Sequence, residues 1–183
     1  MNVAEAIRSV RDDYVEQLGA FVAQEQRANS VAARDCRLAM PQSTLFARAY
    51  VPDIYVPGPP ERMTDFVPRA RDGKLPEFTF RTPNVTVEFE DLWWDDLRLD
   101  HDGEFTGPLI SAWFNRWFPA AQPQPARSAG AEGYIHSACV DERWITADLG
   151  SADAKSLFEL LNVAQKCGAT HVRVSTTRAQ TAL

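Results

Sequence analysis

Residues 134–177 decide the fold, and they read "YIHSACVDERWITADLGSADAKSLFELLNVAQKCGATHVRVSTT". The apolar runs "YIHSACV" and "WITADL" flank the short polar turn "DER", which predicts a β-hairpin. Ser151 is expected to cap a helix over residues 152–167, which Gly168 closes, and "HVRVSTT" follows as a last strand. The apolar face of that helix consists of Leu157, Leu160, Leu161 and Ala164. This C-terminal ββαβ unit, residues 134–183, predicts an α+β fold with a mixed or antiparallel sheet.

The preceding segment, residues 84–118, predicts further strands of the same sheet. "NVTVEFE" alternates between apolar and polar residues, as a half-buried strand does. Its apolar positions are Val85, Val87 and Phe89. The alternation breaks at "DLWWDD", which indicates a bulge or a turn, and it resumes in "LRL". The dipeptide "DG" at 102–103 then predicts a hairpin in which residues 104–106 return as a strand.

A Trp-rich helix is expected directly after these strands. Gly107-Pro108 marks its start, because proline fits the first helical turn. One broad apolar face is formed by Leu109, Ile110, Trp113, Phe114, Trp117 and Phe118. Trp113 and Trp117 are four residues apart and therefore lie on the same side of the helix. We expect this helix at the centre of the hydrophobic core.

Residues 1–40 are predicted to form a helical arm. Apolar residues recur every three or four positions over residues 3–28, which is typical of an amphipathic helix. This stripe consists of Val3, Ile7, Val10, Tyr14, Leu18 and Phe21. The pair Asn29-Ser30 offers a cap from which a second helical stretch is expected to run up to residue 40.

One region of the chain is expected to contain little helix, and another to be a surface connector. Residues 41–83 hold eight of the twelve prolines, so we expect an extended wrap over the fold with short edge strands. Residues 119–133 are rich in Pro, Ala and Gly and are expected to be a surface connector. With the other segments they make up one domain over residues 1–183.

Net charge is concentrated in residues 88–104, "EFEDLWWDDLRLDHDGE". This stretch holds eight carboxylates and one arginine, whereas residues 1–87 carry 11 acids and 11 bases. Residues 105–183 carry 6 acids and 7 bases, so the short acidic stretch accounts for the whole net charge of −6. Such a local field attracts basic partners and repels nucleic acid.

The acidic stretch therefore predicts a docking site for a basic protein. Adjacent side chains of a strand point to opposite faces, so one of the two tryptophans can face outward as an interface anchor within a charged rim. The predicted partner-binding residues are Glu88, Glu90, Asp91, Trp93, Trp94, Asp95, Asp96, Asp100 and Asp102. This composition suits a small inhibitor or immunity-type protein that binds no nucleic acid. A solvated rim that keeps the protein soluble remains an alternative interpretation.

The same carboxylates support a different hypothesis, a metal-dependent hydrolase or nuclease. Asp100, His101 and Asp102, with Glu88 or Glu90, could supply ligands for a divalent cation. The fragment "DHDG" resembles part of a calcium loop, but the loop needs an acidic twelfth position, and Ser is found there. An EF-hand is therefore excluded.

Other catalytic and targeting signals are weak. His136, Cys139 and Asp148 suggest a thiol nucleophile, but His136 and Cys139 would lie on opposite faces of one strand. No phosphate-binding glycine motif is present, so no cofactor is expected. The chain has no apolar run of membrane-spanning length and no apolar segment near its start that indicates a signal peptide. Its three scattered cysteines, Cys36, Cys139 and Cys167, favour free thiols and a cytoplasmic location.

Overall fold

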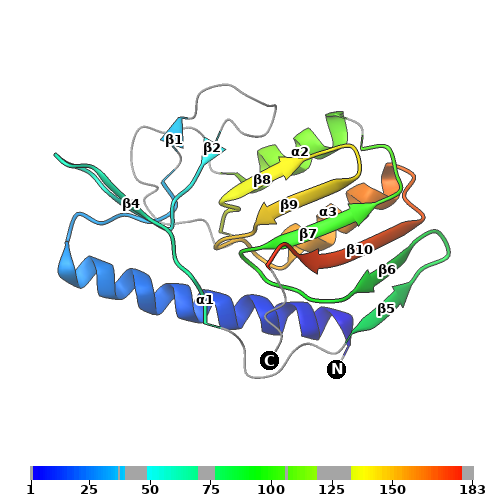
Figure 1. The fold of residues 1–183 in the computed structure, drawn as a ribbon, viewed down its shortest axis with the longest axis horizontal. Helices are drawn as coiled ribbons and strands as arrows, with labels where there is room; N and C mark the ends of the chain where they lie inside the picture. The colour runs from blue at the N-terminus through cyan, green and yellow to red at the C-terminus, as the bar shows by residue number, and fades with distance from the viewer. Residues whose placement is uncertain are drawn as a thin grey trace.

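The computed structural model describes residues 2–36, 38–39, 49–69, 77–105, 107–118 and 133–178. At its centre lies a six-stranded sheet formed by β5 (Phe78–Arg81), β6 (Thr86–Phe89), β7 (Leu97–His101), β8 (Ser137–Val140), β9 (Trp144–Asp148) and β10 (His171–Thr176). Around it pack α1 (Val3–Ala28), α2 (Gly107–Trp117) and α3 (Lys155–Lys166). Figure 1 shows α2 and α3 behind the sheet and α1 running below it. The predicted α+β fold is confirmed.

The last strand, β10, lies inside the sheet, whose order is β5-β6-β10-β7-β9-β8. β10 runs parallel to β6 and antiparallel to β7, so the sheet is mixed. In this register Val174 lies opposite both Phe89 of β6 and Leu99 of β7. β6 and β7 follow each other along the chain but are not neighbours, and the acidic connection between them passes the end of β10 (Figure 1).

The apolar face of the sheet packs against α2 and α3. Alternate residues of β6, β7, β9 and β10 are buried, as the alternating sequence pattern predicts. Trp113 and Trp117 of α2 are 3% and 1% exposed. Their indole N–H groups donate to the Ser156 carbonyl and the Glu159 carboxylate of α3, each at 2.8 Å. The Trp-rich helix is thus part of the core, as expected.

Helix α1 joins the same core through its predicted stripe. Its buried residues are Ala6, Ile7, Val10, Tyr14, Leu18 and Val22. Asn2 and Glu5 form a capping box that satisfies the first backbone donors of the helix. Arg11 donates to the Ala152 carbonyl at 3.1 Å, and the Tyr14 ring lies 5.8 Å from that of Phe66. α1 thus contacts the segment between β9 and α3 and the segment that follows β4.

The proline-rich segment contains short strands where the structure describes it. β1 (Leu38–Ala39) pairs with β2 (Ala49–Tyr50), and β3 (Ile54–Val56) pairs with β4 (Arg62–Thr64). The described parts of residues 41–83 contain no helix, as predicted. Residues 40–48, 70–76 and 119–132, which include nearly all of the expected surface connector, lie outside the described residues. No helix of the described chain is long and apolar enough to cross a membrane.

The predicted helical arm over residues 1–40 is corrected, because α1 ends at Ala28 and residues 29–36 and 38–39 are not helical. Ala33 exchanges two backbone hydrogen bonds of 2.8 Å with Tyr55 of β3. Asp35 has a φ of 54° and a side chain that is 3% exposed. A buried carboxylate needs partners from elsewhere in the fold, so tertiary contacts override the local helix signal here.

The predicted return strand after "DG" is also wrong for its described residues 104–105, which form no strand. The Asp102 carboxylate accepts hydrogen bonds from the backbone of Thr170 at 2.8 Å and of His171 at 2.9 Å. The Glu104 N–H donates to the Cys167 carbonyl at 3.0 Å. β7 already has β9 and β10 on its two edges, so no edge is left for a returning strand.

Replacing Trp113 with Ala should lower the free energy of unfolding by about 3–5 kcal/mol, because it removes a large buried ring and leaves a cavity. Denaturant unfolding measures this loss. Val67→Ala is the control, since Val67 is 77% exposed and its loss should change stability by less than about 0.5 kcal/mol. A loss below about 1 kcal/mol for Trp113→Ala would contradict a central role for this ring.

Candidate functional site

The sheet face opposite α2 and α3 presents charged side chains at its centre. Arg173 of β10 lies in register with Glu88 of β6 on one side and Asp100 of β7 on the other. Its guanidinium is 3.5 Å from the Glu90 carboxylate and 3.5 Å from that of Asp100. The side chains of Glu88, Glu90 and Arg173 are 43%, 46% and 47% exposed. This face is therefore in contact with solvent.

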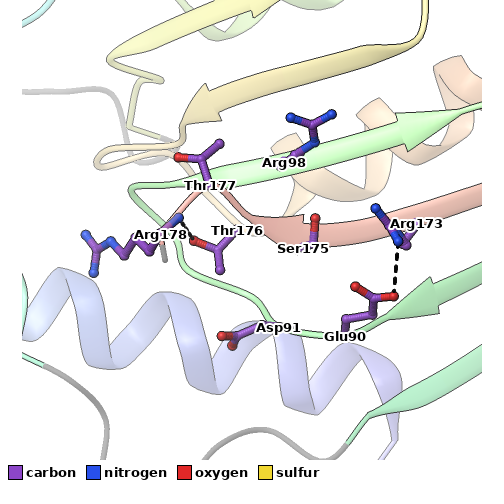
Figure 2. A pocket seen from close by; sticks show the side chains of 8 residues that line it. All are labelled: Glu90, Asp91, Arg98, Arg173, Ser175, Thr176, Thr177 and Arg178. Atoms are coloured by element: carbon purple, nitrogen blue, oxygen red, sulfur yellow. Dashed lines mark hydrogen bonds and ion pairs between the residues drawn. The ribbon is translucent and has the colours of Figure 1, made fainter. Parts of the chain in front are cut away.

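A polar cavity of about 340 Å³ opens beside Arg173 (Figure 2). It is lined by Glu90, Asp91, Arg98, Arg173, Ser175, Thr176, Thr177 and Arg178. These residues come from the connection after β6, from β7, and from the end of β10. Arginines, carboxylates and hydroxyls make up its whole lining, so the cavity offers charge and hydrogen bonds rather than an apolar surface.

Several carboxylates of residues 88–104 pair with cations of the same chain. Arg98 donates to Asp100 at 2.7 Å, and these hydrogen bonds hold the pKa of Asp100 below its usual value. The Glu88 carboxylate lies 3.1 Å from His171 Nε2. These pairs lie on the exposed face, where ion pairs contribute little to stability. They leave the carboxylates accessible to other cations.

Asp95 and Asp96 instead hold the turn that follows β10. Asp96 accepts hydrogen bonds from the hydroxyl and N–H groups of Thr177 and from the Arg178 N–H, at 2.6, 3.0 and 2.9 Å. It also accepts one from the Thr176 hydroxyl at 2.5 Å. Asp95 forms an ion pair with Arg178. Burial of the Asp95 carboxyl raises its pKa to about 6, although Arg178 opposes this shift.

Asp102 does not belong to the cavity. It lies at the opposite end of β7 from Asp95 and Asp96, where it binds the first residues of β10. Slight burial favours its neutral form, but the hydrogen bonds from Thr170 and His171 outweigh this and lower the pKa of Asp102 to about 2. Of the predicted acidic residues, Glu90 and Asp91 thus line the cavity. Asp95, Asp96 and Asp100 contact its arginines, and Glu88 lies in register with Arg173. Asp102 lies apart from them.

The two tryptophans have different environments, as the sequence argument expects. Trp94 is 1% exposed, and its indole N–H donates to the Gly150 carbonyl at 3.0 Å. Trp93 is partly exposed, and its indole N–H donates to Asp91 at 3.2 Å. The Arg178 guanidinium carbon lies 4.0 Å from the centre of the Trp93 ring. Trp93 is therefore the tryptophan near the surface.

A second polar cluster is buried around His136. Its Nε2 lies 2.9 Å from Asp35 Oδ1, and its Nδ1 lies 2.9 Å from Asp53 Oδ1. Ser151, which was expected to cap α3, donates its hydroxyl to Asp35 at 2.9 Å instead. α3 begins at Lys155 and has no side-chain cap. The exposed fractions of His136, Asp35 and Asp53 are 2%, 3% and 3%, so this is an interior network.

The imidazole of His136 is held in its charged form. Burial disfavours the imidazolium, but hydrogen bonds to Asp35 and Asp53 outweigh it and raise the pKa of His136 to about 10. Burial likewise disfavours the Asp35 carboxylate, yet its hydrogen bond with His136 keeps the pKa of Asp35 below its usual value. The network is therefore an internal ion pair that joins the segment after α1 to the strand-forming C-terminal region.

The thiol hypothesis finds no support in this geometry. Both ring nitrogens of His136 face carboxylates, so neither is left to activate a thiol. Cys139 is exposed on β8, and the Asp148 carboxylate accepts a hydrogen bond from the Gly150 N–H at 2.8 Å. Cys36, Cys139 and Cys167 are all free thiols, as expected.

The metal hypothesis likewise gains no supporting observation. Asp100 is bound by Arg98, and His101 places Nδ1 3.1 Å from the Gly103 carbonyl on the buried side of β7. Asp102 is held by the start of β10. Within the described part of the chain, no group of three or more His, Cys, Asp or Glu residues is arranged to hold a metal ion.

Comparisons with known proteins add no assignment. The chain matches no protein-family model, no curated protein and no solved structure. The site must therefore be interpreted from its own geometry.

Sequence reasoning missed the basic and hydroxyl half of the cavity, Arg173 and residues 175–178. The alternation of "HVRVST" already placed His171, Arg173 and Ser175 on one face of a strand. No local signal indicated that this strand lies between β6 and β7. The same is true of Asp35 and Asp53, which reach His136 across 101 and 83 residues of chain.

Replacing His136 with Gln should destabilise the protein by about 3–5 kcal/mol at pH 6, because Asp35 and Asp53 lose their buried cation. The folded pKa of about 10 exceeds the ordinary value of 6.5, so the stabilisation is fully present below pH 6.5 and is lost as the pH rises through about 10. Denaturant unfolding at several pH values should therefore show the gap between the two proteins narrowing between pH 6.5 and 10.

His171→Gln serves as the control for this prediction. The side chain of His171 is 49% exposed, so we expect its replacement to change the free energy of unfolding by less than about 1 kcal/mol. A constant gap between wild type and His136→Gln across the alkaline range would contradict the internal ion pair.

Proposed function

We propose that the protein is a small binding module that docks a basic protein partner through an acidic patch. The patch consists of Glu88, Glu90, Asp91, Asp95, Asp96 and Asp100 around the polar cavity. The observation that carries this proposal is its charge balance. Among the described residues, these six carboxylates lie beside three arginines, Arg98, Arg173 and Arg178, and one histidine, His171, so acidic side chains outnumber basic ones here.

The exposed carboxylates can exchange a cation of their own chain for a cation of another protein. Glu90 pairs with Arg173 at 3.5 Å, and both side chains are close to half exposed. Exposed ion pairs of this length contribute at most about 1 kcal/mol, so a cation of a partner can replace Arg173 at little cost. Glu88 is exposed to a similar degree, and its ion-pair partner among the described residues is His171. These two glutamates should contribute most to steering a basic protein toward the patch.

Other residues of this surface have side chains whose positions are fixed by contacts within the chain. Asp96 and Asp100 are tied into the sheet by hydrogen bonds, so their charges stay in place when a partner arrives. Trp93 adds a partly exposed aromatic surface next to them. Aromatic side chains within a charged rim are typical centres of protein interfaces. An inhibitor or immunity-type role agrees with this chemistry, and three free thiols fit a reducing compartment such as the cytoplasm.

Replacing both Glu88 and Glu90 with Gln should slow association with the partner about 3- to 10-fold at low salt and flatten its salt dependence. The partner is first captured from extracts of the native host and identified. Association rates are then measured at two salt concentrations. Dissociation should change less than association, because the two glutamates act mainly on encounter.

The matched control is the double variant Glu61→Gln and Glu142→Gln, which removes the same charge at exposed positions outside the patch, before β4 and in the turn between β8 and β9. It should associate at nearly the wild-type rate. Equal rates for the patch variant and the wild type would contradict the proposal, as would a captured partner whose binding surface is not basic.

A further inference from the structure

The side chains of Trp93, Asp95 and Asp96 form a compact setting for one guanidinium group. All three come from the connection between β6 and β7, and Arg178 occupies the setting (Figure 2 shows Arg178 at this edge of the cavity). The Arg178 guanidinium lies over the Trp93 ring at 4.0 Å and forms an ion pair with Asp95. Its Nε is 3.9 Å from Asp96 Oδ2. An aromatic face combined with carboxylates is the usual environment of a bound arginine.

The two carboxylates have different tasks in this setting. Asp96 accepts hydrogen bonds from the hydroxyls of Thr176 and Thr177 and from the N–H groups of Thr177 and Arg178, so it mainly fixes the backbone of the turn. Asp95 interacts with the guanidinium itself. Its side chain is 10% exposed, and its Oδ1 has no hydrogen-bond partner. A carboxylate in this position needs a cation, since an unpaired buried charge is costly.

Arg178 is held by the turn after the last strand, where its N–H donates to Asp96 at 2.9 Å and to the Thr176 hydroxyl at 3.1 Å. β10 ends at Thr176, so Arg178 lies beyond the sheet and makes no strand hydrogen bonds. Its side chain is 30% exposed, three times the exposed fraction of Asp95. Within this ion pair Asp95 is therefore the buried partner and the guanidinium the more exposed one.

We infer that Trp93, Asp95 and Asp96 form an arginine-recognition site that Arg178 fills within its own chain, and that an arginine of the partner takes its place. This inference rests on the proposed function and names its central contact. Lysine would fit less well, because its ammonium lacks the planar fork and the flat face that stacks on an indole. The adjoining cavity, with Glu90 and Asp91 on its wall, offers space for residues beside the incoming arginine.

Arg178 then acts as an internal competitor. It is attached to the same chain, so its effective concentration at the site is high and an external arginine must displace it. Removing this side chain should therefore open the site. A partner's arginine can displace Arg178 only if the rest of the acidic patch adds binding energy. This requirement selects proteins that carry several basic residues around one arginine.

The test uses the full chain and the peptide acetyl-Gly-Arg-Gly-amide, with acetyl-Gly-Lys-Gly-amide for comparison. The variant Arg178→Ala should bind the arginine peptide at least about tenfold more tightly than the wild type does. It should bind the lysine peptide several-fold more weakly than the arginine peptide. Binding is followed by NMR at the indole N–H of Trp93, and adding Trp93→Ala to Arg178→Ala should abolish it in calorimetry.

A second variant covers the case in which Arg178→Ala does not fold. Arg178→Lys keeps a cation beside Asp95 and should bind the arginine peptide several-fold more tightly than the wild type. Equal affinity of the wild type and of the folded variants for the arginine peptide would overturn the inference, as would equal affinity for the two peptides. Both outcomes are independent of any captured partner. These outcomes would not contradict docking through Glu88 and Glu90, which is tested by its salt dependence. Conversely, a failure of that docking test would not change the result with the peptides.

Discussion

The insertion of β10 between β6 and β7 is the constraint on which the rest of the structure depends. Both edges of β10 are occupied, and its parallel pairing with β6 is extended by hydrogen bonds from Thr86 N to Thr170 O and from Glu90 N to Val174 O, at 2.9 and 3.0 Å. β6 and β7 cannot pair with each other, so residues 90–96 must pass the end of β10. The acidic connection thereby meets the arginines and hydroxyls of residues 173–178. The polar cavity is a direct result of this strand order.

Some of the acidic residues therefore stabilise the sheet itself, independently of any partner. Asp96 and Asp102 bind the two ends of β10, and each satisfies backbone donors that the sheet leaves open. Such short charged hydrogen bonds are stronger than neutral ones and define the register of the strand. Glu88 and Glu90, whose ion pairs with His171 and Arg173 are close to half exposed, are acidic residues that reach solvent. One segment thus combines strand anchoring with an excess of negative charge.

The interior ion pair of His136 with Asp35 and Asp53 provides a cation for carboxylates that are buried in the core. Residues 29–36, which follow α1, form no helix or strand. The carboxylate of Asp35 in this segment is buried. One protonated imidazole lies between the two carboxylates, Arg34 lies 3.4 Å from Asp35, and Ser151 adds a neutral donor. Buried pairs of this kind add little net stability compared with apolar packing, but they penalise every arrangement that separates them. The cluster therefore ties the first third of the chain to the C-terminal hairpin in one geometry.

Local periodicity was enough to define the elements that bury one face. The stripe of α1, the alternation of β6 and β7, the Trp-rich face of α2 and the ββαβ unit all follow from spacings of two or of three to four residues, because each element must hide its apolar side from water. The concentration of charge in residues 88–104 and the opposite environments of Trp93 and Trp94 could also be expected from the sequence. The order of the strands, the loss of helix after Ala28 and the ion pair of His136 could not. They depend on contacts between residues far apart in the chain, such as those of Thr86 with His171 and of Asp35 with His136. Which strand edges and which polar partners remain free after the core has formed decides these contacts.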